Sequence, residues 1–265
     1  MNLPRRKFLH LAAGAAALSA APRFASAQAW PARPVRFIVP FAAGGPLDIV
    51  ARLIAQWLSD RLGGQFVVEN RAGAGGNIGT EAAIRAIPDG YTFLVVGASN
   101  AINPSLYAKL NFDPVRDLVP VAGIGRGPGV MEINPSVPAK TVPEFIAYAK
   151  ANPGKITMAS GGVGTYQHLS GELFKMMTGV DLIHVPYRGS GPALIDLVSG
   201  QVQMMIDPMT SSIEHVKAGR LRALGVSSAT RWDMLPDVPA VAEFVPGYET
   251  KGCGALWRPR TRLPR

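Results

Sequence analysis

The chain has 265 residues, and its composition excludes several classes of protein before any motif is considered. The chain is long enough to bury a large core, as one domain or as two lobes. The single cysteine, Cys253, excludes an internal disulfide framework, and no two histidines have the spacing of a metal site. We therefore expect neither a metal ion nor a cofactor.

The formal net charge of +9 is unevenly distributed along the chain. Much of the excess lies in the first 27 residues and after Gly247, and the stretch between them is close to neutral. Nucleic-acid binding requires Lys and Arg gathered on one face of a domain. We therefore predict no nucleic-acid partner.

The first 27 residues are expected to form a signal peptide rather than part of the fold. Arg5 and Arg6 precede an apolar run, 11–21, and small residues end at Ala27. The run is shorter than the about 20 helical residues that span a bilayer. We expect cleavage after Ala27 and a periplasmic mature protein. The paired arginines leave the general secretory and twin-arginine routes both open.

After this leader, short apolar strands alternate with amphipathic helices, a pattern typical of a layered α/β protein with parallel sheets. The expected strands are 36–39, 66–70, 92–96, 118–124, 129–133, 157–159, 183–186, 202–206 and 221–227. The expected helices include 47–62, 143–152 and 166–177. In the first of these helices, Leu53 and Trp57 belong to the predicted apolar face.

A stretch rich in Gly and Pro, residues 123–138, predicts a crossing between two lobes. A second series of strands and helices of comparable length begins after it. We therefore expect lobe 1 over residues 28–127 and lobe 2 over residues 128–246.

Four of the predicted strands end in loops of small, hydrogen-bonding residues. In open α/β sheets, ligands bind outside the carboxyl ends of the strands. After strand 36–39, Gly44 and Gly45 permit a tight turn, and the helix that follows leaves its first amides unpaired, which attracts a small anion. The other three loops are 97–100, 160–165 and 207–212. We expect loops from both lobes to enclose one cleft.

The candidate ligand-binding residues come from these loops and from the strand end near residue 187. They are Phe41, Ala42, Gly44, Gly45, Asp48, Ala98, Ser99, Asn100, Gly161, Gly162, Thr165, His168, Tyr187 and Asp207. The helix dipole favours Asp48 in a first turn with or without a ligand, and Thr165 is expected to cap its helix. The same dipole disfavours the imidazolium form of His168, which predicts a neutral hydrogen-bonding role. Asp207 ends an apolar strand and needs a hydrogen-bond donor or solvent.

Six motifs occur in a characteristic order. They are PFAAGGPLD (40–48), ENRAGAGGNIG (69–79), PDGY (88–91), NPSLY (103–107), HVPYRGSGPA (184–193) and LPDVP (235–239). In this order they resemble the Bug family, the periplasmic solute-binding proteins of tripartite tricarboxylate transporters. The resemblance implies a two-lobed Venus-flytrap fold, similar to type II periplasmic binding proteins.

The same resemblance implies a function. Such a protein closes on a small carboxylate, which can be a di- or tricarboxylate, an acidic amino acid or an aromatic acid. It implies that loop 41–48 holds a ligand carboxylate through backbone amides and ordered waters, with Ser99, turn 161–165 and Asp207 around the cleft. We expect a monomer that works with the membrane subunits of the transporter.

The chain departs from that family in two places. Ala43 and Leu47 stand where many members have proline and threonine, and Leu47 favours an apolar ligand body. The family usually continues beyond this point with a strand and helices that return to lobe 1, whereas residues 247–265 show no apolar periodicity. We expect an aberrant tail in place of that return, with uncovered apolar surface on lobe 1 and lowered stability.

Two other functions have partial support in the sequence. Gly97-Ala-Ser-Asn-Ala101 approximates the nucleophile elbow of α/β hydrolases, with Ser99 as the nucleophile. Its fifth position is alanine, and Pro104 is expected to interrupt the helix that should follow, so we predict no enzyme. The glycine run 73–79 fails the dinucleotide fingerprint, and no P-loop is present in the sequence. A ligand-binding sensor remains an alternative to transport.

Overall fold

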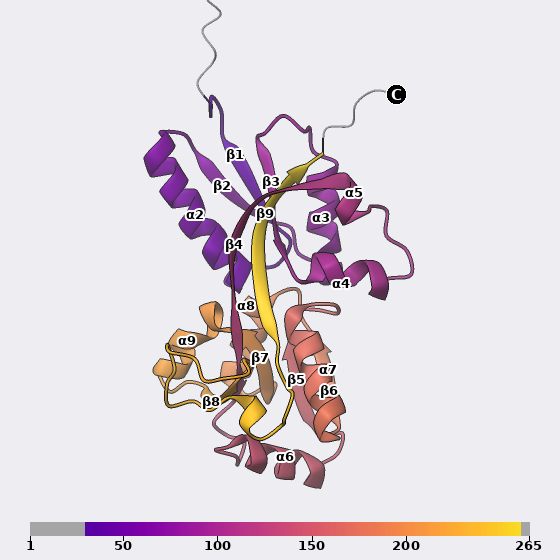
Figure 1. Cartoon of the computed structure of the whole chain (residues 1–265), viewed down its shortest axis with the longest axis vertical. Coiled ribbons are helices and arrows are strands. Elements are labelled where there is room, and N and C mark those ends of the chain that lie inside the picture. The colour runs from indigo at the N-terminus through magenta and orange to yellow at the C-terminus, as the bar shows by residue number, and fades with distance from the viewer. Residues whose placement is uncertain (1–29, 261–265) are drawn as a thin grey trace, which may run out of the picture.

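The computed structural model describes residues 30–260 and shows two α/β lobes joined by strands that run between them (Figure 1). The expected signal peptide and its cleavage point after Ala27 lie outside the described residues. Within residues 30–260, none of the helices combines the length and the hydropathy that a membrane span requires.

Lobe 1 is built on a sheet with the strand order β2-β1-β3-β9-β4. The strands are β1 (Val35–Val39), β2 (Phe66–Asn70), β3 (Thr92–Gly97), the first part of β4 (Leu118–Ile133) and β9 (Lys251–Pro259). The helical segments are α2 (Pro46–Leu62), η1 (Ala74–Gly76), α3 (Asn77–Ile84), α4 (Ser99–Leu106) and α5 (Pro114–Asp117). β1 is parallel to β2 and β3, whereas β9 is antiparallel to both of its neighbours.

Lobe 2 uses the second part of β4 in the order β4-β7-β5-β6, and β8 also pairs with β4. Its strands are β5 (Ile156–Ser160), β6 (Leu182–Pro186), β7 (Met204–Pro208) and β8 (Arg222–Val226). Its helical segments are α6 (Val142–Ala151), α7 (Tyr166–Thr178), α8 (Ser190–Ser199), α9 (Met209–Lys217) and η2 (Val241–Glu243). β5 is parallel to β6 and β7, and β4 is antiparallel to β7 and β8.

Each lobe has a hydrophobic core of its own. In lobe 1, Phe37 packs edge-on against Phe66 and Phe93, with ring centroids 5.7 and 5.8 Å apart. In lobe 2, Phe174 packs edge-on against Tyr248 at 6.1 Å. Because each core is complete within its lobe, the lobes can move as units about the strands that join them.

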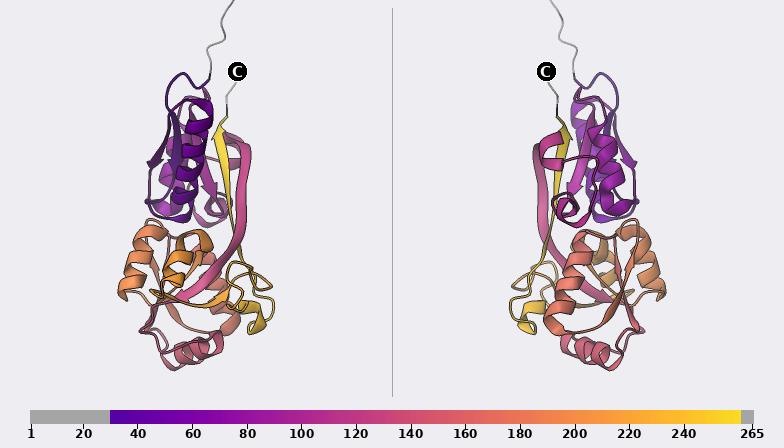
Figure 2. Two further views of the ribbon diagram at one scale, coloured as in Figure 1. Left: turned by 90° about the vertical axis from the view of Figure 1, so that its left-hand side faces the viewer. Right: turned by 90° about the vertical axis from the view of Figure 1, so that its right-hand side faces the viewer.

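β4 is one continuous strand, where the sequence predicted two strands separated at residues 125–128. It passes through Gly125 and Gly127 because its backbone pairs with β9 from Leu118 to Pro128. Register shifts between Pro120 and Ala122 and between Gly123 and Gly125 mark bulges, which increase local twist and bending. The views in Figures 1 and 2 agree that β4 and β9 run side by side from one lobe to the other.

The tail differs most from the sequence expectation. We expected residues 247–265 to replace the return to lobe 1, but 251–259 form β9, which re-enters lobe 1 between β3 and β4. A strand with paired neighbours on both sides gains hydrogen bonds from its backbone whatever its side-chain pattern is. This explains how a segment without apolar periodicity becomes part of the sheet. Residues 261–265 lie outside the described residues.

Two helices also differ from the expectation. In α2 the core-facing residues include Ala51 and Ala55, whereas Leu53 and Trp57 are 65% and 58% exposed, so the predicted apolar face was wrong at those positions. α4 continues through Pro104 to Leu106 rather than being interrupted there.

Candidate functional site

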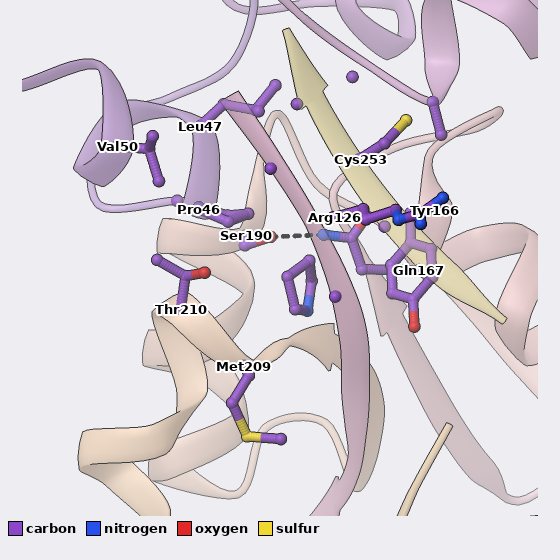
Figure 3. A pocket seen from close by; sticks show the side chains of 18 of the residues that line it. Pro46, Leu47, Val50, Arg126, Tyr166, Gln167, Ser190, Met209, Thr210 and Cys253 are labelled. Atoms are coloured by element: carbon purple, nitrogen blue, oxygen red, sulfur yellow. Dashed lines mark hydrogen bonds between the residues drawn. The ribbon is translucent and has the colours of Figure 1, made fainter. Parts of the chain in front are cut away.

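A cavity of about 410 Å³ is walled by both lobes and by the strands that join them. Figure 3 shows Pro46, Leu47 and Val50 of α2 along one side and Met209 and Thr210 of α9 below them. The joining strands contribute residues 124–128 of β4 and 252–254 of β9. The volume lies within the range of about 300–1,000 Å³ found for small-molecule sites.

Five helices begin at the wall of this cavity. They are α2, α4, α7, α8 and α9, and no side chain caps the N-terminus of any of them. The first amides of a helix have no acceptor within the helix, and the helix dipole places a partial positive charge at that end. Five such ends around one cavity favour an anionic occupant.

The loop between β1 and α2 is held in shape by a buried carboxylate. Asp48 is 3% exposed and accepts hydrogen bonds from Gly44 N (3.0 Å), Arg52 Nε (3.0 Å) and Asn70 Nδ2 (2.9 Å). Burial raises the pKa of Asp48, but the hydrogen bonds and the charge of Arg52 outweigh it and hold that pKa below its usual range. Asp48 therefore orients the loop, and Gly44 supplies the positive φ of 79° that the turn needs.

Two backbone amides of this loop already have acceptors. Gly44 donates to Asp48, and Ala42 N–H donates to the carbonyl oxygen of Arg188 in lobe 2 at 2.9 Å. The loop was expected to hold a ligand carboxylate through its backbone amides. That expectation stays a prediction for the other amides of the loop, and in this conformation Phe41, Gly45 and the first turn of α2 line the cavity.

Asp207 plays the corresponding part in lobe 2, at the end of β7. It is fully buried, and its Oδ1 accepts from Gln167 Nε2 at 2.9 Å and Ser190 Oγ at 2.8 Å. Its Oδ2 accepts from Ser212 Oγ at 3.1 Å and from Ser211 Oγ. Burial raises the pKa of Asp207 and these four hydrogen bonds oppose the rise. Asp207 does not line the cavity, but it holds Gln167 and Ser190, which do.

His168 also lies behind the cavity wall. Its ring stacks on His184 with centroids 4.2 Å apart, and its Nδ1 accepts from Gly164 N–H at 3.3 Å. His184 Nε2 lies 2.6 Å from Ser160 Oγ. Burial lowers the pKa of both imidazoles, that of His184 to about 4, which agrees with the neutral form expected for His168. The pair supports the turn 161–165 from outside.

The structure brings half of the expected binding residues to the cavity. Seven line it: Phe41, Gly45, Asp48, Ala98, Ser99, Gly161 and Thr165. Seven lie elsewhere: Ala42, Gly44, Asn100, Gly162, His168, Tyr187 and Asp207.

The side-chain contacts explain three of these placements. Asn100 donates to Thr80 Oγ1 (2.9 Å), and Tyr187 donates to Asp196 Oδ2 (2.6 Å); burial and then Asp196 raise the pKa of Tyr187 to about 12. Thr165 does not cap its helix, because its hydroxyl donates to the carbonyl oxygen of Gly162 at 2.7 Å.

Sequence reasoning missed several wall residues, above all Arg126 and Gln167. Arg126 lies on β4 and is the cationic side chain of the wall; within residues 30–260 no carboxylate forms a salt bridge with it. It is the one charged residue in the Gly-rich stretch 123–129, and that contrast was a usable signal. Gln167, in the first turn of α7, has no such local signal.

The family model described as "Tripartite tricarboxylate transporter family receptor" matches residues 50–262. The chain belongs to this family. It is 43% identical over 225 residues to Protein BugT of Bordetella pertussis. The aligned region covers 84% of this chain and 68% of BugT. This confirms the resemblance to the Bug family.

Two solved structures resemble this Bug-family chain. R. palustris Rpa4515 with adipate has a TM-score of 0.85 and 40% identity, covering 88% of this chain and 79% of that one. MatC (Rpa3494) from Rhodopseudomonas palustris with bound malate has a TM-score of 0.82 and 34% identity, covering 87% and 79%.

These matches confirm the two-lobed fold expected from the sequence. Proteins of the family are periplasmic solute receptors and not enzymes, so the hydrolase alternative with Ser99 is excluded.

Proposed function

We propose that this receptor captures a small carboxylate in the cavity between its lobes and delivers it to the membrane subunits of a tripartite tricarboxylate transporter. The observation that carries the proposal is the convergence of five uncapped helix N-termini on one cavity. A carboxylate can accept several of their free amides at once. Arg126 supplies the positive charge that such a ligand needs.

The rest of the wall suits an apolar ligand body. Leu47, Val50, Ile124, Met209 and Trp232 line the cavity beside the polar helix ends. A di- or tricarboxylate, an acidic amino acid or an aromatic acid combines a carboxylate with a compact carbon skeleton. The adipate and malate bound to the two similar structures are small dicarboxylates of this kind.

Ligand capture proceeds by lobe closure in this proposal. The lobes contact each other directly, since Ala42 N donates to Arg188 O (2.9 Å) and Tyr107 Oη donates to Val163 O (3.3 Å). A ligand that contacts both lobes stabilises the closed form by its differential affinity for that form.

Isothermal titration calorimetry with organic acids and their uncharged amides tests the proposal. Adipate and malate are compared with adipamide and malamide on the mature chain. We expect at least one carboxylate to bind while its amide does not. Arg126→Ala should weaken that binding by about 10- to 150-fold, because a charged hydrogen bond contributes about 1.5–3 kcal/mol. Arg220→Ala, at an exposed position away from the cavity, is the matched control. Binding of the amides as tightly as the acids would refute carboxylate recognition.

A further inference from the structure

The wall of lobe 2 presents an unpaired hydrogen-bond acceptor to the cavity. Gln167 is 6% exposed, and its Nε2 donates to Ser190 Oγ at 2.6 Å and to Asp207 Oδ1 at 2.9 Å. A side-chain amide has two N–H groups, so both are used. Figure 3 draws the Gln167–Ser190 hydrogen bond as a dashed line.

The carbonyl oxygen of the same amide, Gln167 Oε1, points away from Asp207 and Ser190. Among residues 30–260, no donor forms a hydrogen bond with Gln167 Oε1. This oxygen lies beside Gly161, a residue of the cavity wall, because a Cβ atom built on Gly161 would be 3.5 Å from it. The amide cannot turn over, because Asp207 only accepts, and a flipped amide would set Oε1 against its carboxylate. Ser190 is fixed as well, since its own proton goes to Asp207 Oδ1 at 2.8 Å.

We propose that the ligand of this receptor is a hydroxy-substituted carboxylate whose hydroxyl group donates to Gln167 Oε1. The inference rests on the proposed function, because it assigns the ligand class of the same cavity. A ligand carboxylate placed at this point would be repelled by the carbonyl oxygen. A methylene group there would cover a polar oxygen without giving it a partner, which is costly in a buried site.

A hydroxyl group suits this position better than an ammonium group. Arg126 and the five helix N-termini make the cavity electrically positive, and a second cation would be disfavoured there. A neutral hydroxyl donates one hydrogen bond without adding charge. The site therefore selects a hydroxy acid over both its deoxy analogue and its amino analogue.

The test compares matched ligands by calorimetry on the mature chain. The pairs are malate and succinate, citrate and tricarballylate, and 2-hydroxyadipate and adipate, with aspartate as the amino analogue of malate. We expect the hydroxy acid of at least one pair to bind tenfold or more tighter than its deoxy partner. Gln167→Met, which keeps the length of the side chain and removes the acceptor together with the two donors to Ser190 and Asp207, should bring the two affinities within about threefold. Gln56→Met makes the same change on the exposed face of α2 and should leave the ratio unchanged.

The outcomes separate this inference from the proposed function. If carboxylates bind and every pair shows equal affinities, the hydroxyl assignment is overturned and carboxylate capture stands. If aspartate binds more tightly than malate, the preference for a neutral donor is overturned. If no carboxylate binds to the wild-type chain, the proposed function fails and the inference fails with it. If circular dichroism shows that Gln167→Met is unfolded, the affinities of the wild-type chain for the matched pairs still test the hydroxyl assignment. Gln167→Asn then serves as a second variant, because its shorter amide cannot reach both Asp207 and the ligand.

Discussion

The contact between the two lobes leaves no room for a methyl group at Gly191. This residue lies in the first turn of α8, and a Cβ there would overlap the carbonyl oxygen of Ala43 and lie 3.2 Å from its carbonyl carbon. Ala43 belongs to the lobe 1 loop before α2, so Gly191→Ala inserts a methyl group between the lobes. Gly191 does not have a positive φ, and alanine favours a helix over glycine by up to about 1 kcal/mol. The substitution therefore acts on closure and not on the fold of either lobe.

The expected magnitude follows from the tightness of the contact. The obstructing atoms are backbone atoms and cannot turn away as a flexible side chain would. Adding a methyl group to a fitted contact costs about 1–3 kcal/mol. Since each 1.4 kcal/mol is a factor of ten, affinity for a carboxylate that the wild type binds should fall by about 5- to 150-fold. Gly123→Ala is the control, because nothing lies within 4 Å of a Cβ at that position of β4.

Calorimetry and urea denaturation together decide the outcome. We expect weaker ligand binding by Gly191→Ala, an unchanged or slightly raised unfolding midpoint without ligand, and a larger radius of gyration by small-angle X-ray scattering. Full retention of affinity would refute the idea that this contact forms on closure. A loss of ligand-free stability equal to the loss of affinity would show that the contact belongs to the resting fold.

Two buried carboxylates give further predictions. Asp48→Ala removes the acceptor that binds Gly44 N–H and Arg52, so the free energy of unfolding at pH 7 should fall by about 2 kcal/mol in urea titrations. The difference should shrink as pH falls through the depressed pKa of Asp48, and equal midpoints at pH 7 would contradict the role of this carboxylate. In Glu132, burial and then the charge of Asp207 raise the pKa well above 4.5, so the folded chain keeps a proton that the unfolded chain releases. Stability should therefore fall as pH rises from about 4.5 towards the raised pKa, and Glu132→Gln should abolish that fall; parallel pH profiles of the two proteins would refute it.

The first strand, turn and helix were predictable because their signals are local. Apolar residues in β1, glycines at 44 and 45 and Pro46 at the first helical position each act within a few residues of the chain. The start of α2 was accordingly placed within one residue. The same locality explains the error at Leu53 and Trp57, since apolar character alone does not say which apolar residues of a helix meet the core.

β4 and β9 were harder to predict because their partners are distant in sequence. Gly125 pairs with Gly254 and Arg126 with Cys253, and no local pattern of side chains announces such pairs. Two glycines of β9, Gly252 and Gly254, line the cavity. A Cβ on Gly254 would approach Leu47 Cδ2 to 3.4 Å, so a small residue keeps that part of the wall open. The need for a small residue at position 254 arises from its contact with Leu47 in the folded protein, so the sequence of the strand alone does not predict it.

The candidate site shows the same division between local and tertiary information. Of the helix starts that surround the cavity, those of α2 and α7 were predictable, because Gly and Thr turns after apolar strands mark them. The starts of α4 and α9 lie in segments that were expected to be loops, and the start of α8 was not assigned. The role of Asp207 was not predictable, because it depends on which donors reach it. A carboxylate at the end of an apolar strand needs hydrogen bonds, and the sequence suggested that a ligand contact was among them. The structure supplies four donors from Gln167, Ser190, Ser211 and Ser212, so the carboxylate is satisfied before any ligand arrives.

Asp48 and Asp207 both fix the positions of helix N-termini at the cavity. Free helix N-termini attract an anion only if they are held in place, and Asp48 does this in lobe 1 while Asp207 joins the first turns of α7, α8 and α9 in lobe 2. Because both carboxylates are buried in hydrogen bonds to the protein, they leave room for a ligand carboxylate in the cavity. Their negative charge also offsets part of the positive potential of the helix ends, which weakens anion binding. Under the proposed function the receptor passes a carboxylate to membrane subunits, and weaker binding favours that release. A cavity lined by more arginines without these aspartates would retain a carboxylate for longer.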